Sequence, residues 1–199
     1  RLMAIVVATL CNNWALNTFL SYMPKYVNGP ITSGGLGVEL DSSLFIYLIL
    51  IPSIVSIFSL LFGGFLADSL IKKGHNILNV RRSVNSIGFF GSAVFLYMIS
   101  LQDSMYQVLL LLCLINLCSG ICAGGFGVNH ADLGPKYTGS LVGISGSLGM
   151  LAAISSPIVA GYVLEISNSW NSIFYICSSV LIFGGIFYLF FSSATKQFE

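Results

Sequence analysis

Long apolar runs, separated by short polar segments, make up most of this chain of 199 residues. The apolar core of a bilayer is about 30 Å thick and takes about 20 residues of helix to cross. The runs are continuously apolar, which favours helices over the alternating strands of a barrel. The predicted helices cover residues 2–22, 43–67, 84–100, 106–126, 140–164 and 172–191. The pattern therefore predicts an all-α integral membrane protein with a bundle of six transmembrane helices.

The composition also indicates a lipid environment. Apolar residues make up 56% of the chain and charged residues only 8%, whereas soluble domains carry about 25% charged residues. The net charge of +1 argues against a nucleic-acid partner. The five cysteines lie inside apolar runs, with no convergent histidine or aspartate at the same depth. We therefore expect buried apolar cysteines, no metal site and no cofactor.

Basic residues fall almost entirely on one side of the predicted membrane. Six spans place successive loops on alternating sides, and only Lys25 lies on the second side. The basic residues of the first side are Arg1, Lys72, Lys73, Arg81, Arg82, Lys136 and Lys196. The positive-inside rule makes this side cytosolic, together with both chain ends. We expect a multi-pass membrane protein in a membrane that the sequence does not specify. Because the chain begins without methionine, we expect it to be part of a longer protein.

The loop at residues 125–139 collects most of the polar chemistry. Asn129, His130, Asp132 and Lys136 lie within eight residues of one another. The predicted topology places this loop on the cytosolic face, so we do not expect it to be the substrate pocket. We predict a hinge and gate latch in which Asp132 pairs with Lys136. His130 is either a group that titrates near neutral pH or a loop histidine that pairs with Asp132.

A glycine-rich motif at the end of the second predicted helix resembles a known family signature. The run from Gly63 through Asp68 to Lys72, Lys73 and Gly74 resembles the G-x-L-a-D-x-x-x-[KR]-[KR]-G signature of the major facilitator superfamily. Asp68, at the cytosolic edge, can face the positive N-terminal end of a neighbouring helix. The resemblance implies that this element is a gate latch. The alternative is an acidic helix end followed by ordinary basic loop residues.

The polar loop carries a more specific resemblance. Residues 126–137 resemble the N-H-x-D-[IL]-x-P-[RK]-Y pattern of the organic anion transporter family, which includes vesicular glutamate transporters, sialin and sodium–phosphate cotransporter-like proteins. The resemblance covers essentially the whole chain. It implies the C-terminal half of a twelve-helix transporter, a 3+3 inverted repeat whose N-terminal six-helix half is a missing partner. The vesicular glutamate transporters have an arginine where Asn12 stands, which argues against a glutamate substrate.

The activity implied by this resemblance is secondary active transport of a small organic or inorganic anion. Transport would proceed by alternating access, coupled to H⁺ or Na⁺. A membrane enzyme would need a nucleophile, a metal cluster or paired carboxylates, whereas Asp68, Asp103 and Asp132 are widely separated along the chain. A truncated relative or a non-transporting membrane scaffold is the alternative that stays open.

Uncharged polar residues are the candidates for contact with the substrate, because no predicted helix has an ionisable side chain in its middle. We expect Asn13, Trp14, Ser119 and Ser145 to line the central cavity. Packing between helices is the alternative for each of them. Gly146 stands where the family tends to carry an asparagine. A substrate-orienting amide is therefore missing here or supplied by another residue. The resemblance places the arginine and the carboxylate of the transport site in the N-terminal half.

Overall fold

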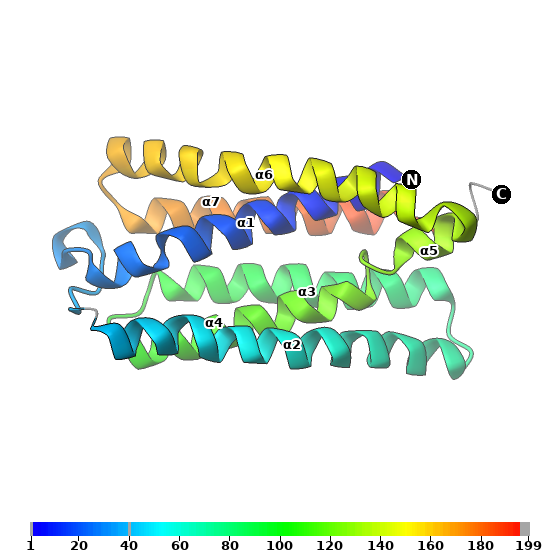
Figure 1. Cartoon of the computed structure of the whole chain (residues 1–199), viewed down its shortest axis with the longest axis horizontal. Helices are drawn as coiled ribbons and strands as arrows, with labels where there is room; N and C mark the ends of the chain where they lie inside the picture. The colour runs from blue at the N-terminus through cyan, green and yellow to red at the C-terminus, as the bar shows by residue number, and fades with distance from the viewer. Residues whose placement is uncertain (1, 40, 196–199) are drawn as a thin grey trace.

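Long helices run side by side along the whole structure (Figure 1). The computed structural model describes residues 2–39 and 41–195, so Arg1 and Lys196 of the charge count lie outside the described residues. The long helices are α1 (Leu2–Asn28), α2 (Ser42–Lys72), α3 (Ile77–Ile99), α4 (Met105–Ile121), α6 (Thr138–Ser167) and α7 (Trp170–Phe191). The short elements are η1 (Ile31–Ser33), η2 (Cys122–Gly124), α5 (Asn129–Leu133) and η3 (Pro135–Tyr137).

The packing of the helices follows an inverted repeat. α1 packs on α6 and α7, and α4 packs on α2 and α3 in the same way, while α3 and α7 contact each other. Figure 1 shows that α1 and α4 run in opposite directions. The three helices α1–α3 therefore correspond to the three helices α4, α6 and α7 with inverted orientation. This arrangement agrees with the predicted all-α bundle with 3+3 inverted symmetry.

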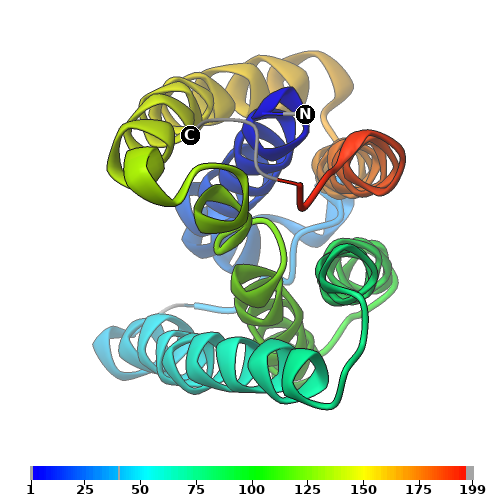
Figure 2. The same cartoon turned by 90° about the vertical axis from the view of Figure 1, so that its right-hand side faces the viewer.

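Two helices at opposite margins of the bundle are poorly covered. Seen from the end, α2 and α6 lie on the margins, with α1 and α4 between them and α3 and α7 together on one side (Figure 2). Only 17% of the apolar window of α2 and 22% of that of the segment containing α6 are buried, against 44% for α1. α2 and α6 therefore present most of their apolar surface to lipid or to another part of the complete protein.

Five helical segments of the described residues are long and apolar enough to cross a membrane, and α3 is not among them. α3 lies alongside the others and has 23 residues, which correspond to about 35 Å of helix. It packs between α4 and α7 and buries Arg81 and Asn85. These two polar side chains therefore lie on the face of α3 that packs against neighbouring helices.

Several helix ends differ from the prediction. α1 continues past residue 22 to Asn28, with Pro24 inside the helix, and α2 continues past residue 67 to Lys72. α3 begins at Ile77 and not at 84, because the Asn76 Oδ1 atom accepts the Leu78 N–H at 2.9 Å and caps the first turn.

The end of α4 and the region that follows also differ from the prediction. α4 ends at Ile121, and the predicted helical residues 122–126 include the 3₁₀ turn η2. A Cβ atom at Gly124 would collide with the carbonyl oxygen of Gly63. At this close contact with α2, the chain therefore continues as the turn η2 and not as a further turn of α4.

Candidate functional site

Arg81 and Asp132 form a buried ion pair between α3 and α5. The Nε atom of Arg81 donates to Asp132 Oδ2 at 2.8 Å, and Nη2 donates to Oδ1 at 3.4 Å. A third donor of Arg81, Nη1, bonds the carbonyl oxygen of Gly124 at 2.8 Å. The Arg81 side chain is only 4% exposed, so its charge depends on this carboxylate for compensation.

The predicted pair between Asp132 and Lys136 is wrong. Among the described residues the single ion pair is the one between Arg81 and Asp132, and Lys136 is exposed. The physical reason is that the guanidinium group of Arg81 offers two parallel donors to one carboxylate, a geometry that an ammonium group lacks. Asp132 also does not pair with His130.

His130 is buried and connects α5 to α6. Its side chain is 4% exposed. Nδ1 lies 3.0 Å from the carbonyl oxygen of Gly127, and Nε2 lies 2.7 Å from Ser145 Oγ. A carbonyl oxygen only accepts, so Nδ1 carries the hydrogen that faces Gly127. The interpretation of His130 as a loop histidine that pairs with Asp132 is therefore wrong, because the imidazole is turned towards α6.

Asn129 in α5 also makes a buried hydrogen bond. Its Nδ2 atom donates to the hydroxyl of Tyr188 in α7 at 2.8 Å, and both residues are fully buried. Side chains of α5 therefore bond to α3, α7 and α6 through Asp132, Asn129 and His130. We call these three residues with Arg81 the α5 clamp. It holds the segment between α4 and α6 against the rest of the bundle.

Replacing Ser145 with alanine should destabilise the protein by about 1–2 kcal/mol. The change would leave Nε2 of the buried His130 without its partner at 2.7 Å, and an unsatisfied buried polar group costs about that much. Thermal or chemical unfolding of the purified full-length protein measures the loss. Ser147 is exposed on the same helix and is the matched control, because Ser147→Ala should change stability by less than about 0.5 kcal/mol. Equal losses in the two variants would contradict this role of Ser145.

The predicted cavity residues do not all lie together. Ser145 is 2% exposed and bonded to His130, so in this structure it faces the α5 clamp and not an open cavity. Ser119 in α4 donates to Asn12 Oδ1 in α1 at 3.2 Å. Asn13 lies against α6, where a Cβ atom at Gly149 would collide with its Nδ2 atom.

Trp14 and Gly146 have different surroundings. Trp14 borders a shallow hollow between α1, α6 and α7, which is also lined by Leu151 and Phe183, on the side of α1 away from Asn12 and Leu16. A Cβ atom built at Gly146 meets no atom within 4 Å. Of the cavity candidates, Asn13 and Ser119 are therefore near the contact of α1 with α4 and α6, Gly146 is open, and Trp14 is separate.

Asp68 lies at the end of α2 and is exposed. It forms no ion pair and no hydrogen bond through its side chain within the part of the chain that the structure describes. The contact with the N-terminal end of a neighbouring helix therefore stays a prediction.

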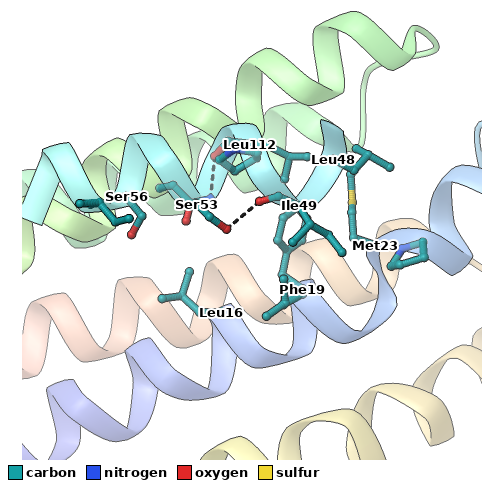
Figure 3. Close-up of a pocket in the computed structure, with 13 residues that line it drawn as sticks. Leu16, Phe19, Met23, Leu48, Ile49, Ser53, Ser56 and Leu112 are labelled. Atoms are coloured by element: carbon teal, nitrogen blue, oxygen red, sulfur yellow. Dashed lines mark hydrogen bonds between the residues drawn. The ribbon is translucent and has the colours of Figure 1, made fainter. Parts of the chain in front are cut away.

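A cavity of about 320 Å³ lies between α1, α2 and α4 (Figure 3). Most of its lining is apolar, and Phe19, Met23 and Leu48 are among the side chains that surround it. Its polar side chains are Ser53, Ser56 and Asn116. No pattern in the sequence indicates this cavity.

Arg81 and Tyr188 were not predicted from the sequence as partners of the polar loop. A prediction that starts the third helix at residue 84 leaves Arg81 in a solvated loop, where it counts only as a cytosolic charge. The signal that could have found it is Asn76, a favourable N-cap residue directly before the apolar positions Ile77 and Val80. No comparable local signal marks Tyr188, which lies 59 residues from its partner Asn129.

Comparison with known proteins identifies the class to which this bundle belongs. Residues 2–197 match the family described as the Major Facilitator Superfamily. The chain belongs to this family of membrane transporters, as the motif at Gly63–Gly74 indicated.

Several named proteins are similar to this chain over almost its whole length. The chain is 31% identical to "Probable anion transporter 4, chloroplastic" of Oryza sativa subsp. japonica, over 98% of this chain and 32% of that protein. It is 30% identical to sialin of Homo sapiens, over 98% of this chain and 39% of that protein. It is 32% identical to vesicular glutamate transporter 1 of Xenopus laevis, over 98% of this chain and 33% of that protein. The predicted family resemblance is confirmed, and the chain spans about a third of the length of these relatives.

Proposed function

We propose that the complete protein is a secondary active transporter that carries a small anion across a membrane by alternating access. This chain would be its C-terminal half, and the N-terminal six helices would pack against the face that α2 and α6 leave uncovered. The observation that carries the proposal is the position of the polar side chains of the spans. Asn12, Asn13 and Ser119 lie on α1 and α4, the two helices between the poorly covered α2 and α6 (Figure 2).

The chemistry of this face limits what this half does for an anion. Its polar groups are amides and hydroxyls, which can donate hydrogen bonds to an anion but cannot balance its charge. A bidentate grip on a carboxylate or phosphate needs an arginine, and Arg81 is already paired with Asp132. The charge of the substrate would therefore be met by the N-terminal half, with Asn13 and Ser119 contributing hydrogen bonds and Gly146 leaving open space.

The α5 clamp is proposed as part of the gate at the cytosolic end. The turn between α2 and α3, α5 and the end of α7 lie at one end of the bundle, and the end of α1 lies at the other (Figure 1). The first end carries Lys72, Arg82 and Lys136, which supports a cytosolic orientation. Asp68 would complete the latch by contacting the N-terminal half. A similar protein of Arabidopsis thaliana is named "Sodium-dependent phosphate transport protein 1, chloroplastic", which favours an ion-coupled cycle driven by Na⁺ or H⁺.

Uptake by the full-length protein in liposomes tests this function. The panel of labelled anions should include phosphate, ascorbate, urate and glutamate, because similar proteins are named for them. At least one anion should accumulate above the level of protein-free liposomes, and an imposed ion gradient should raise the uptake. Absence of uptake for every anion under H⁺ and Na⁺ gradients would contradict the proposal and favour the scaffold alternative.

Introducing an amide at Gly146 should change substrate preference. Asparagine fits, since a Cβ atom there meets no atom within 4 Å, and one hydrogen bond of about 1 kcal/mol changes relative uptake by about fivefold. The measurement is the ratio of initial uptake rates among the anions of the panel for Gly146→Asn. The control is Gly139→Asn, where the space is equally open but the residue lies in the first turn of α6. An unchanged ratio for Gly146→Asn would place this position outside the substrate route.

A further inference from the structure

We infer that the cavity between α1, α2 and α4 binds a monovalent cation, with Na⁺ as the ion whose ligands it provides. A role of this ion in coupling rests on the proposed function, whereas the binding of Na⁺ to the cavity does not. Three features of the cavity support this site: the direction of the hydrogen bonds around it, two prolines that line it and the absence of charge among its lining residues.

Two polar side chains that line the cavity keep acceptor atoms free. Asn116 Nδ2 donates to the carbonyl oxygen of Leu112 at 3.0 Å. A carbonyl oxygen cannot donate, so this bond fixes the orientation of the amide and leaves Oδ1 without a donor among the described residues. Ser53 Oγ donates its hydrogen to the Ile49 carbonyl at 2.6 Å and keeps its lone pairs free. Figure 3 shows both bonds at the wall of the cavity.

A proline adds a backbone acceptor at the same place. Pro52 lies inside α2, is buried and lines the cavity. Proline has no N–H, so it cannot supply the helical hydrogen bond to the carbonyl oxygen of Leu48, four residues earlier. Leu48 also lines the cavity, and no side chain of the described residues donates to its carbonyl. α1 repeats the pattern, because Pro24 and Leu20 have the same spacing and both line the cavity.

A third proline shows how such a carbonyl is otherwise satisfied. Pro157 lies inside α6 and leaves the carbonyl oxygen of Ala153 without its helical donor. There the hydroxyl of Ser156 donates to Ala153 O at 3.1 Å. α2 has no such substitute, since Ser53 bonds Ile49 and not Leu48. The carbonyl oxygen next to Pro52 is therefore left for a ligand or for water.

These groups are suited to a monovalent cation. Free oxygen acceptors bind cations, which favours a cation over the anionic substrate in this cavity. None of the residues that line it carries a charge, whereas sites for Ca²⁺ use carboxylates. Carbonyl oxygens of interrupted helices coordinate Na⁺ in other transporters. The volume of about 320 Å³ has room for the ion and several waters at about 30 Å³ each, with Ser56 available as a further hydroxyl ligand.

The test measures Na⁺-dependent stability of the purified full-length protein, because a ligand that binds the folded state raises its melting temperature. The melting temperature is recorded against NaCl, KCl and choline chloride at equal ionic strength. We expect a saturable rise with NaCl that exceeds the rise with KCl or choline chloride. Asn116→Leu, which removes Oδ1, should raise the half-saturating Na⁺ concentration by about tenfold, the equivalent of about 1.4 kcal/mol.

The prolines provide a matched pair of variants. Pro52→Ala restores an N–H that can bond the Leu48 carbonyl and should also raise the half-saturating Na⁺ concentration. Pro157→Ala restores an N–H in α6, where the carbonyl already has a donor, and should leave the Na⁺ dependence unchanged. The comparison concerns the dependence on Na⁺ and not the absolute stability, which both substitutions change. A Na⁺ effect that Asn116→Leu and Pro52→Ala leave intact would overturn this site.

Uptake assays on the same preparation separate this inference from the proposed function. Anion uptake without any specific effect of Na⁺ on the melting temperature would overturn the cation site and leave the transporter proposal standing. A specific Na⁺ effect that both cavity variants weaken, in a protein that takes up no anion, would support the cation site and contradict the proposed function.

Discussion

Replacing Asp132 with alanine should lower the free energy of unfolding by about 3–5 kcal/mol, the usual cost of removing one partner of a buried ion pair. The guanidinium group of Arg81 is 4% exposed and would lose both of its bonds to the carboxylate. The remaining bond to the Gly124 carbonyl cannot compensate its charge. Chemical unfolding of the full-length protein in detergent measures the loss.

The control for this prediction lies four residues away in the same loop. Lys136 is exposed and has no ion pair among the described residues, so Lys136→Ala should change the free energy of unfolding by less than about 0.5 kcal/mol. The double variant Arg81→Met with Asp132→Leu should recover part of the stability, because no uncompensated charge remains. Equal losses for Asp132→Ala and Lys136→Ala would show that the pair does not hold α5 in place.

Replacing Gly63 with valine should cost about 3 kcal/mol, at the upper end of the usual range for overpacking. A Cβ atom at this position would lie 2.7 Å from the Cα atom of Ile121 and 2.8 Å from its carbonyl oxygen. These are backbone atoms, so relief requires α2 to move away from α4. The helices should then pack less closely, and the melting temperature of the full-length protein should fall.

The neighbouring glycine provides the control. A Cβ atom at Gly64 meets no atom within 4 Å, and valine has a better helix propensity than glycine by a few tenths of a kcal/mol. Gly64→Val should therefore leave the melting temperature unchanged or raise it slightly. If Gly63→Val were tolerated as well as Gly64→Val, the close crossing of α2 over α4 would not be needed for stability.

The bundle itself could be predicted from the sequence because lipid imposes a simple rule on it. A spanning segment must be apolar for most of its length and must satisfy its own backbone hydrogen bonds, so the long helices follow from the apolar runs. The helix ends could not be placed as well, since outside the apolar core capping groups decide them. α3 is the clearest example, because Asn76 starts it well before its apolar stretch and brings Arg81 into the buried interior.

The candidate site was predictable in its residues but not in their partners. The sequence indicated that Asn129, His130 and Asp132 act together, and the structure places all three in α5. Their partners Tyr188, Ser145 and Arg81 come from three different helices. Pairings of this kind depend on how the helices are oriented about their own axes, which the local sequence does not specify. Charge alone suggested Lys136 for Asp132, and the geometry of the guanidinium group decided otherwise.

The central claim is that α6 borders a water-accessible anion route in the complete protein. It predicts that a cysteine at Gly146 reacts with a charged, membrane-impermeant thiol reagent and that a transported anion slows the reaction. Leu151, on the opposite side of α6 beside Trp14, gives the matched variant Leu151→Cys, which should react slowly and without protection.

The most direct measurement is therefore the labelling rate of Gly146→Cys in the full-length protein, with and without the anion that the uptake panel identifies, after subtraction of wild-type labelling. The account predicts fast labelling that the anion slows at least severalfold. Labelling of Gly146→Cys that is as slow as that of Leu151→Cys, or that no transported anion changes, would contradict it.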